Sequence, residues 1–176
     1  MALQNRLDLF DFSDPDKSGR WMIVNDGVMG GISESRLFLN EKGFLVFQGR
    51  VSLEYGGGFA SVRSIHNELD ANSYHGIMIK FRGDGKTYQL RLRHQDRMDG
   101  VSYFQYFQTE KNKWRTVFLP FSRFQANFRG RLLPNHPKLD TKRISQIGLM
   151  ISDKQDGFFQ LEIERIALFK EENFNT

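Results

Sequence analysis

The sequence predicts an all-β domain built as an antiparallel β-sandwich or jelly roll. Aromatic residues make up 14% of the 176 residues, and 17 of them are Phe; such side chains favour pleated, half-buried strands. Apolar and polar residues alternate over short runs, most clearly at 86–95, as in strands with one buried face. Turn residues separate about ten to twelve such runs, at the spacing of sandwiches and barrels.

Each strand is expected where such a run lies between turn residues. In chain order, the expected strands are 7–12, 36–39, 44–48, 50–54, 59–65, 76–82, 86–95, 102–109, 113–119, 144–152 and 158–169. The turns at 40–43, 110–112 and 153–157 predict hairpins, because these connections are too short for a crossover helix. Only 65–72 and 120–127 are candidates for short helices.

Composition limits the kinds of site and of surroundings. The absence of Cys excludes a disulfide, a thiol nucleophile, an Fe–S cluster and a Cys-zinc site. No apolar stretch approaches the roughly 20 residues of a membrane span, so no membrane insertion is expected. Residues 1–12 lack a signal or transit pattern, which predicts a cytoplasmic location. One domain is expected over 1–176, with its core at 7–169 and a frayed tail.

Residues 21–33 combine Asn-Asp-Gly and Met-Gly-Gly turns within an apolar frame. One interpretation is a binding loop that presents backbone amides and Asp26. The other, which local physics favours, is a tight connection that plugs one end of the sandwich. Three glycines at 56–58 precede a strand that carries Arg63. If that arginine faces inward it needs a carboxylate partner, and Asp26 or Glu54 could serve.

Four segments, in order along the chain, resemble one known family. They are VNDGVMGGIS at 24–33, GGFASVR at 57–63, the block 114–121, and the block 147–157. Through them the chain resembles the complex I intermediate-associated protein 30 family over residues 10–169. The resemblance implies a galactose-binding-like jelly roll and a role as an assembly factor. Mitochondrial members assist assembly of respiratory complex I, and plant relatives support photosystem biogenesis. As a nearly bare domain, the chain resembles a stand-alone, prokaryotic member.

Polar side chains on one predicted strand offer a candidate binding surface. Together with the next strand, that surface is expected to comprise Gln89, Arg91, Arg93, Tyr103, Gln105 and Phe107, with Asp26 and Arg63 as further ligand- or partner-binding candidates. Aromatic rings stack on ligands and guanidinium groups make paired hydrogen bonds, so a concave face of this kind could bind a sugar or a peptide. The alternative is a solvated outer face, where mixed Arg and Gln are ordinary.

Two loops are expected at the rim of this surface. The first contributes Asn25 and Met29, and the second contributes Arg123, Arg129 and Arg131. Basic residues interleaved with Phe could bind an acidic protein surface or RNA. Equally, the Phe residues could anchor the second loop to the core and leave its arginines solvated. Nucleic acid is not expected as a partner.

Catalysis has little support, and no cofactor is expected. The four His show no metal-site spacing, and no nucleophile motif or distinctive carboxylate pair is present. Calcium stays a minor alternative, because jelly rolls bind it through loop Asp and carbonyl groups. The candidate pairs are Asp153 with Asp156 and Asp96 with Asp99.

The sequence therefore predicts a non-catalytic binding or assembly module. Its partner would be a protein, such as a membrane-complex subunit or an assembly intermediate, held by the concave sheet face and the rim loops. An exposed aromatic patch on a rigid sheet loses little entropy on docking. The alternative is a carbohydrate- or small-ligand-binding module that uses the same face, and a hydrolase is a weaker third interpretation.

Overall fold

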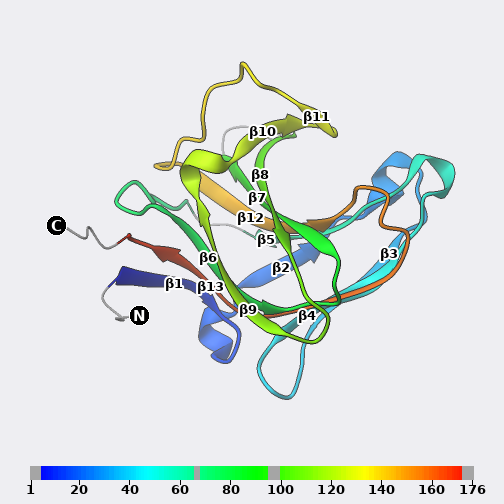
Figure 1. Ribbon diagram of the computed structural model, residues 1–176, viewed down its shortest axis with the longest axis horizontal. Coiled ribbons are helices and arrows are strands. Elements are labelled where there is room, and N and C mark those ends of the chain that lie inside the picture. The colour runs from blue at the N-terminus through cyan, green and yellow to red at the C-terminus, as the bar shows by residue number, and fades with distance from the viewer. Residues whose placement is uncertain (1–4, 66–67, 95–99, 172–176) are drawn as a thin grey trace.

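Two antiparallel β-sheets pack face to face to form the body of the protein (Figure 1). The computed structural model describes residues 5–65, 68–94 and 100–171. One sheet has six strands: β1 (Arg6–Asp11), β3 (Glu34–Leu39), β4 (Leu45–Val51), β6 (Gly76–Arg82), β9 (Trp114–Pro120) and β13 (Gly157–Phe169). The other has seven: β2 (Arg20–Ile23), β5 (Ala60–Ile65), β7 (Thr87–His94), β8 (Val101–Gln108), β10 (Gln125–Phe128), β11 (Arg131–Leu132) and β12 (Ile144–Ile151). The predicted β-sandwich is confirmed.

The strand order explains which segments become neighbours. The first sheet runs β3-β4-β13-β6-β9, with β1 also paired to β13, and the second runs β11-β10-β8-β7-β12-β5-β2. Four 3-10 turns lie in the connections, namely η2 (Pro15–Lys17), η3 (Asp26–Met29), η4 (Glu54–Gly56) and η5 (Phe121–Arg123). Because β2 and β11 are opposite edges of the second sheet, the segments 24–33 and 129–136 flank it from opposite sides.

The period-2 pattern of β7 sets one wall of the core. Tyr88, Leu90 and Leu92 are fully buried and face the six-stranded sheet, which contributes Ile79 and Phe81. Burial of such apolar surface is the main force that holds two sheets together. The alternating polar residues of β7 therefore lie on the outer face of the seven-stranded sheet.

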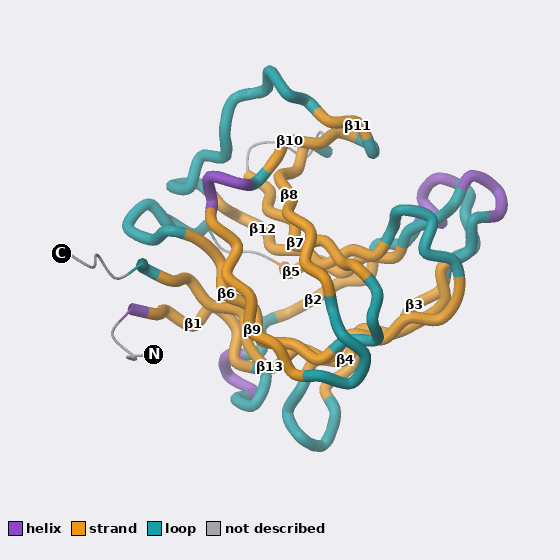
Figure 2. The backbone as a smooth tube through the Cα atoms, in the orientation of Figure 1, coloured by secondary structure: helices purple, strands orange, loops and turns teal. Residues whose placement is uncertain are grey.

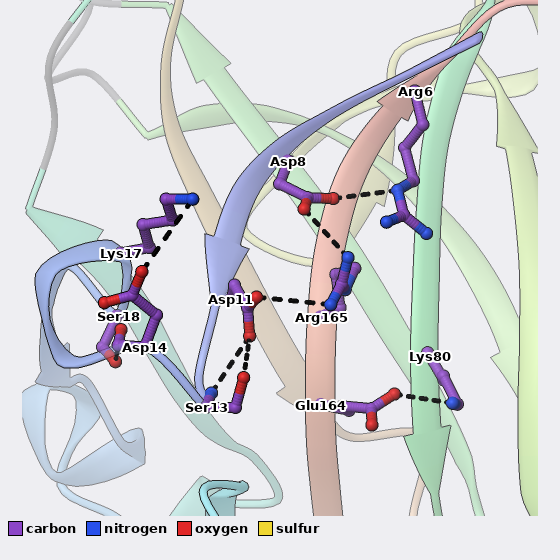
Figure 3. A network of polar contacts seen from close by, with 10 residues as sticks. All are labelled: Arg6, Asp8, Asp11, Ser13, Asp14, Lys17, Ser18, Lys80, Glu164 and Arg165. Carbon is purple, nitrogen blue, oxygen red and sulfur yellow. Dashed lines mark hydrogen bonds and ion pairs between the residues drawn. The ribbon is translucent and has the colours of Figure 1, made fainter. Parts of the chain in front are cut away.

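Ion pairs cover the outer face of the six-stranded sheet (Figure 3). Arg165 on β13 bridges two carboxylates of β1: its Nη1 lies 2.9 Å from Asp8 Oδ2 and its Nη2 lies 3.2 Å from Asp11 Oδ2. On the other edge of β13, Glu164 Oε2 lies 2.7 Å from Lys80 Nζ of β6. The central strand is thus tied to both neighbours by charges that have partners.

The predicted hairpin around 40–43 is confirmed. Strands β3 and β4 pair in antiparallel register from Glu34–Arg50 to Leu39–Leu45. The Asn40 side chain accepts hydrogen bonds from the Lys42 and Phe44 amides, and Gly43 has φ +77°. This is the hairpin chemistry expected of Asn and Gly.

The hairpins predicted at 110–112 and 153–157 are wrong. Strands β8 and β12 belong to the seven-stranded sheet, whereas the strands that follow them, β9 and β13, belong to the six-stranded sheet. Each short turn is a corner at which the chain passes from one layer to the other. A tight turn reverses the chain both in a hairpin and at a corner between two sheets. The sequence of the turn therefore does not specify whether the two flanking strands pair with each other.

The helix predicted at 120–127 is also wrong. Only the single turn η5 forms there, and the chain then extends as β10. Phe124 is 9% exposed and belongs to the core, and Phe121 packs against that core. Their spacing of three residues therefore results from burial of both rings by a turn and a strand, and no helix is involved. In the described part of 65–72 no helix forms; Leu69 instead exchanges two backbone hydrogen bonds with Ile144.

Candidate functional site

The outer face of the seven-stranded sheet carries arginine, aromatic and methionine side chains in two rows. Strand register aligns Arg63, Gly148, Arg91 and Phe104 in one row, and Ser61, Met150, Gln89 and Tyr106 in the next. We call these eight residues the arginine face. Their sequence neighbours Val62, Leu90 and Leu149 are fully buried in the core, so the rows point away from it.

Arg91 is held in place by polar side chains around it. Its Nη1 donates to Gln89 Oε1, and its Nη2 donates to Ser102 Oγ and to Asn127 Oδ1 at 3.2 Å. Its guanidinium carbon lies 5.6 Å from the centre of the Phe104 ring. The Nε–H is buried and has no acceptor among the described residues. The side chain is therefore fixed, with one donor left unsatisfied.

Gly148 leaves a gap between the two arginines of the row. A Cβ at this position would lie 3.6 Å from Arg63 Cγ and 3.9 Å from Arg91 Cβ, so the two side chains flank the glycine. The hollow there, which we call the Gly148 notch, has a volume of about 10 Å³ and is also lined by Arg93 and Gln146. That is roughly the room needed for one water molecule.

Among the residues that the structure describes, neither arginine has a carboxylate partner. Burial lowers the pKa of Arg63, and burial together with repulsion from Arg63 lowers the pKa of Arg91 to about 10. Attraction to Tyr106 and Asp153 acts in the opposite direction on Arg91. Within the described residues no ion pair reaches either guanidinium. At neutral pH both stay charged, so the face holds two poorly solvated cations that no described residue pairs with directly.

Tyr106 is the most exposed ring of the arginine face, at 50%. Its hydroxyl donates to Asp153 Oδ1 at 3.2 Å, and Asp153 Oδ2 accepts from Gln89 Nε2 and Ser152 Oγ. Burial and the Asp153 charge raise the pKa of Tyr106. Both carboxylate oxygens of Asp153 thus accept hydrogen bonds from neutral side chains.

Three residues predicted for this face lie on the other side of the sheet. Register places Tyr103 opposite Leu92, Gln105 opposite Leu90, and Phe107 opposite Tyr88. Tyr103 and Phe107 are buried in the core, and Gln105 Nε2 donates to the Pro120 carbonyl at 2.6 Å. The prediction is wrong because a shift of one residue in register exchanges the two faces of a strand.

The residues that belong on the face instead are Phe104 and Tyr106 from β8, with Gly148 and Met150 from β12. The alternation of β8 shows that Phe104 and Tyr106 share a side, but it does not show which side meets Arg91. No sequence signal marks Gly148 or Met150, which occur within an apolar strand. Arg93 lies on the expected side and lines the Gly148 notch.

Arg63 faces outward, and neither carboxylate suggested for it is its partner. Asp26 is fully buried and is committed elsewhere. Its Oδ1 accepts from the Ser33 N–H at 2.9 Å, and its Oδ2 accepts from the Ser33 hydroxyl at 2.5 Å and from the N–H groups of Gly58 (2.7 Å) and Phe59 (3.3 Å). Asp26 therefore ties together two loops and does not face a ligand.

These contacts explain the glycines around Asp26. A Cβ on Gly31 would lie 2.4 Å from Asp26 Cγ, and one on Gly57 would lie 2.6 Å from Asp26 Oδ2. Both positions need glycine so that the backbone can approach the carboxylate. Burial alone would raise the pKa of Asp26, but the hydrogen bonds from Ser33 and the backbone amides hold it below its usual value.

The predicted rim residues have mixed positions. Asn25 is a structural contact: its Oδ1 accepts from Ser35 Oγ at 3.0 Å and from the Ser61 N–H at 3.3 Å. Arg123, Arg129 and Arg131 are exposed near β10 and β11, at the edge of the sheet opposite β2. The Arg129 guanidinium lies over the Phe128 ring at 5.3 Å. These arginines are a sheet's width away from Asn25 and Met29.

The loops tied together by Asp26 expose apolar side chains. Val28 and Tyr55 are each 75% exposed and Met29 is 59% exposed. They belong to η3 and η4, the short purple turns that lie side by side in Figure 2. The apolar tip stands beyond the β2 edge of the sheet.

Calcium, catalysis and membrane insertion gain no positive evidence. In the described part of the chain no three His, Asp or Glu side chains gather as a metal ion would require. Asp153 is bonded as above, and Asp96 and Asp99 lie outside the described residues. Within residues 5–65, 68–94 and 100–171, no helix is long and apolar enough to cross a membrane.

A family model described as "Complex I intermediate-associated protein 30" matches residues 10–163. The chain belongs to this family. The match includes both loops that Asp26 joins and most of the strands of the two sheets. The resemblance drawn from the four sequence segments is thereby confirmed.

Curated relatives carry the family's name. The chain is 26% identical over 182 residues to "Complex I intermediate-associated protein 30, mitochondrial" of Drosophila melanogaster, covering 91% of this chain and 62% of that protein. It is 28% identical over 183 residues to the protein of the same name in Mus musculus, covering 92% of this chain and 55% of that protein. The chain thus spans little more than half the length of these relatives.

Solved structures show the same fold at low identity. The family 11 carbohydrate-binding module of a Clostridium thermocellum cellulase matches with a TM-score of 0.74 and 14% identity, over 97% of this chain and 98% of that one. The module in complex with a mixed-linked tetrasaccharide matches with a TM-score of 0.72 and 15% identity, over 94% and 96%. At this identity the likeness establishes the sandwich architecture alone.

The prediction of a cytoplasmic location is contradicted. Four relatives, including those of Drosophila melanogaster and Mus musculus, are named mitochondrial. A leader pattern missing from residues 1–12 therefore does not support a cytoplasmic location. The relatives are named for association with an intermediate of complex I, and the modules are named for binding carbohydrate.

Proposed function

We propose that this chain is a non-catalytic binding module that holds a protein partner during assembly of a respiratory complex, through its arginine face. The observation that carries the proposal is that Arg63 and Arg91 lie on an outer sheet face where none of the described residues forms an ion pair with them. An unpaired, partly buried cation lowers stability, so its retention favours a role outside folding. The relatives' names supply the class of partner, an intermediate of complex I.

The contrast between the two sheets supports a binding role for this face. On the outer face of the six-stranded sheet, Arg165 and Lys80 have carboxylate partners (Figure 3). On the seven-stranded sheet, the hydrogen bonds that orient Arg91 all go to neutral groups, and no described carboxylate contacts its guanidinium. Charge complementarity with a partner gives specificity and speeds association.

Site-specific crosslinking tests this proposal. Met22 is 43% exposed and pairs with Arg63 across the sheet, so a photoreactive benzoylphenylalanine at position 22 samples the arginine face. Phe158 is 77% exposed on the six-stranded sheet and provides the matched control position. We expect adducts with respiratory-complex subunits or assembly intermediates from position 22 and none from position 158. Equal labelling from both positions, or no protein adduct at position 22, contradicts the proposal.

A carbohydrate-binding role is the second candidate. It is favoured by the half-exposed Tyr106 ring and by the sandwich neighbours, one of which holds a tetrasaccharide. A glycan array probed with the protein and with Tyr106→Ala separates the two candidates. Binding to a glycan that Tyr106→Ala abolishes, without protein adducts at position 22, would select the carbohydrate role.

A further inference from the structure

We propose that a hollow on the six-stranded sheet binds a small phosphorylated ligand with a flat ring, the chemistry of a nucleotide. The hollow has a volume of about 900 Å³, which is within the range of small-molecule sites. It lies at the β3 end of the sheet, where β3, β4 and β13 are neighbours. The inference goes beyond the proposed function, which concerns the other sheet.

Strand register brings two rows of exposed or half-exposed side chains to this hollow. One row is Arg36, Gln48 and Gln160, and the next is Glu34, Arg50 and Phe158. Residues that alternate with them, such as Phe47 and Phe159, are buried, so both rows point away from the core. Strands in a sheet lie about 4.8 Å apart, so each row extends about 10 Å from β3 to β13.

Four basic side chains line the hollow, from two sides. Arg36 and Arg50 come from the strands, whereas Lys86 and Lys111 come from the segments 83–86 and 110–112, which meet in a Gly83–Lys111 bridge. Within the part of the chain that the structure describes, none of the four forms an ion pair. The ion pairs of Figure 3 involve other cations of this sheet. The hollow therefore collects positive charge that its surroundings do not neutralise.

The two carboxylates at the hollow leave it positive. Asp84 is bonded from three directions: its Oδ1 accepts from the Lys86 N–H at 3.1 Å, and its Oδ2 accepts from the Tyr88 hydroxyl at 3.1 Å and from the Gln160 N–H at 2.8 Å. Glu34 forms no ion pair with a described residue. Four cations against two carboxylates give the lining a net charge of +2, which favours an anionic ligand.

A ring and two amides at the hollow favour a ligand that is also flat. Phe158 is 77% exposed, and the Arg50 guanidinium carbon lies 5.6 Å from the centre of its ring. Nucleobases stack on exposed aromatic rings of this kind. The amide side chains of Gln48 and Gln160 have no hydrogen-bond partner among the described residues, and amides of this type bind the edges of bases. Arginine and lysine bind phosphate groups, so one nucleotide would use the ring, the amides and the cations together.

Isothermal titration calorimetry at low salt tests the inference with defined probes. The protein is titrated with ADP, GDP, CDP and UDP, with adenosine, with inorganic pyrophosphate and with an RNA of about ten nucleotides. We expect at least one nucleoside diphosphate to bind with a Kd below about 1 mM, and the same nucleotide to bind about tenfold more tightly than adenosine or pyrophosphate. No saturable binding of any nucleoside diphosphate, or equal binding of pyrophosphate, overturns the inference. Tighter binding of the RNA than of every single nucleotide overturns it in favour of a strand.

Two substitutions place the ligand in the hollow. Phe158→Ser should weaken nucleotide binding about tenfold and leave pyrophosphate binding unchanged, because it removes only the ring. Lys111→Met should weaken both about tenfold, because it removes a charge. Tyr55→Ser is the matched control for the ring, at 75% exposure outside the hollow, and Arg131→Met, on β11, is the matched control for the charge. Nucleotide binding that both Phe158→Ser and Lys111→Met leave unchanged overturns the site.

The outcomes are independent of those for the proposed function. A small ligand on the six-stranded sheet predicts no protein adducts from position 158. Adducts from position 22 without nucleotide binding would keep the partner surface and reject this site. Nucleotide binding that depends on Phe158, without adducts from position 22, would do the reverse.

Discussion

Replacing Asp26 by Ala should remove a large part of the protein's stability. The carboxylate is 0% exposed and accepts two short amide hydrogen bonds, from Ser33 at 2.9 Å and from Gly58 at 2.7 Å, and a longer one from Phe59 at 3.3 Å. Each stranded amide costs about 1–3 kcal/mol. The Ser33 hydroxyl retains an acceptor, the Ser52 carbonyl at 3.3 Å. The expected loss is about 3–5 kcal/mol, against a typical total of about 5–15 kcal/mol.

Urea unfolding followed by circular dichroism measures this loss. For a chain of this size the expected change lowers the melting temperature by roughly 6–20 °C. Asp70→Asn is the control, because the exposed Asp70 carboxylate accepts a single amide hydrogen bond, from Asn72; it should cost less than about 1 kcal/mol. A cost below about 1 kcal/mol for Asp26→Ala would refute the view that this carboxylate joins the two loops.

Acid pH supplies a second reading of the same contact. The folded pKa of Asp26 lies below its unfolded value, so its contribution is fully present above the unfolded pKa of about 3.9 and is lost as pH falls through the folded value. The difference in unfolding free energy between the protein and Asp26→Asn should therefore shrink as pH falls below about 4. A difference that is constant from pH 7 to pH 3 would contradict this account.

Three further substitutions test the packing described above, each by urea unfolding. Gly31→Ala should cost at least about 1–3 kcal/mol because its Cβ would strike the Asp26 carboxylate, whereas Gly27→Ala meets no atom within 4 Å and should be close to neutral; equal effects would argue against the clash. Arg165→Met should cost about 1–2 kcal/mol, since two partly buried aspartates lose their partner, and no change would mean that these pairs are only surface contacts. Phe158→Ser, at a side chain 77% exposed, should change stability by less than about 0.5 kcal/mol; a larger loss would show that this ring is packed.

The sequence predicts which side chains of a single strand share a face, because this depends only on local alternation of apolar and polar residues. Tyr88, Leu90 and Leu92 share a face by period 2, and their burial follows from the need of each sheet for one apolar side. The turn at 40–43 was also readable, since Asn40 and Gly43 supply the side-chain acceptor and the positive φ that the turn requires.

Strand pairing was not readable, because it depends on contacts between distant segments. The turns at 110–112 and 153–157 look like hairpin turns, yet each joins strands of opposite sheets. Register fails for the same reason: the alternation of β8 is equally compatible with Tyr103 or Phe104 beside Arg91. Which of the two residues lies beside Arg91 is decided by how β8 packs next to Leu90 and Leu92. The alternation within a single strand carries no information about that packing.

The site could be predicted only in part for a related reason. Arg91 and Arg93 were found because they alternate with core residues in one strand. The Gly148 notch requires Arg63, Gly148 and Arg91 to meet across three strands, and a glycine that acts by leaving space has no pattern of its own. The sequence leaves open whether Asp26 binds a ligand or holds the loops together, and the complete burial of its side chain supports the structural role.

Among the segments that connect this chain to its family, some residues hold the loops together and others do not. In 24–33 and 57–59 the residues surround the Asp26 carboxylate, so a match there reports the loop architecture beside β5. Arg63, farther along that strand, contributes nothing to folding that the contacts reveal. A stable frame with an unpaired cation at its surface is the arrangement expected where binding is favoured at the expense of stability. Under the proposed function, the residues to test first are therefore those of the row that contains Arg63, Gly148 and Arg91, which the family match by itself does not single out.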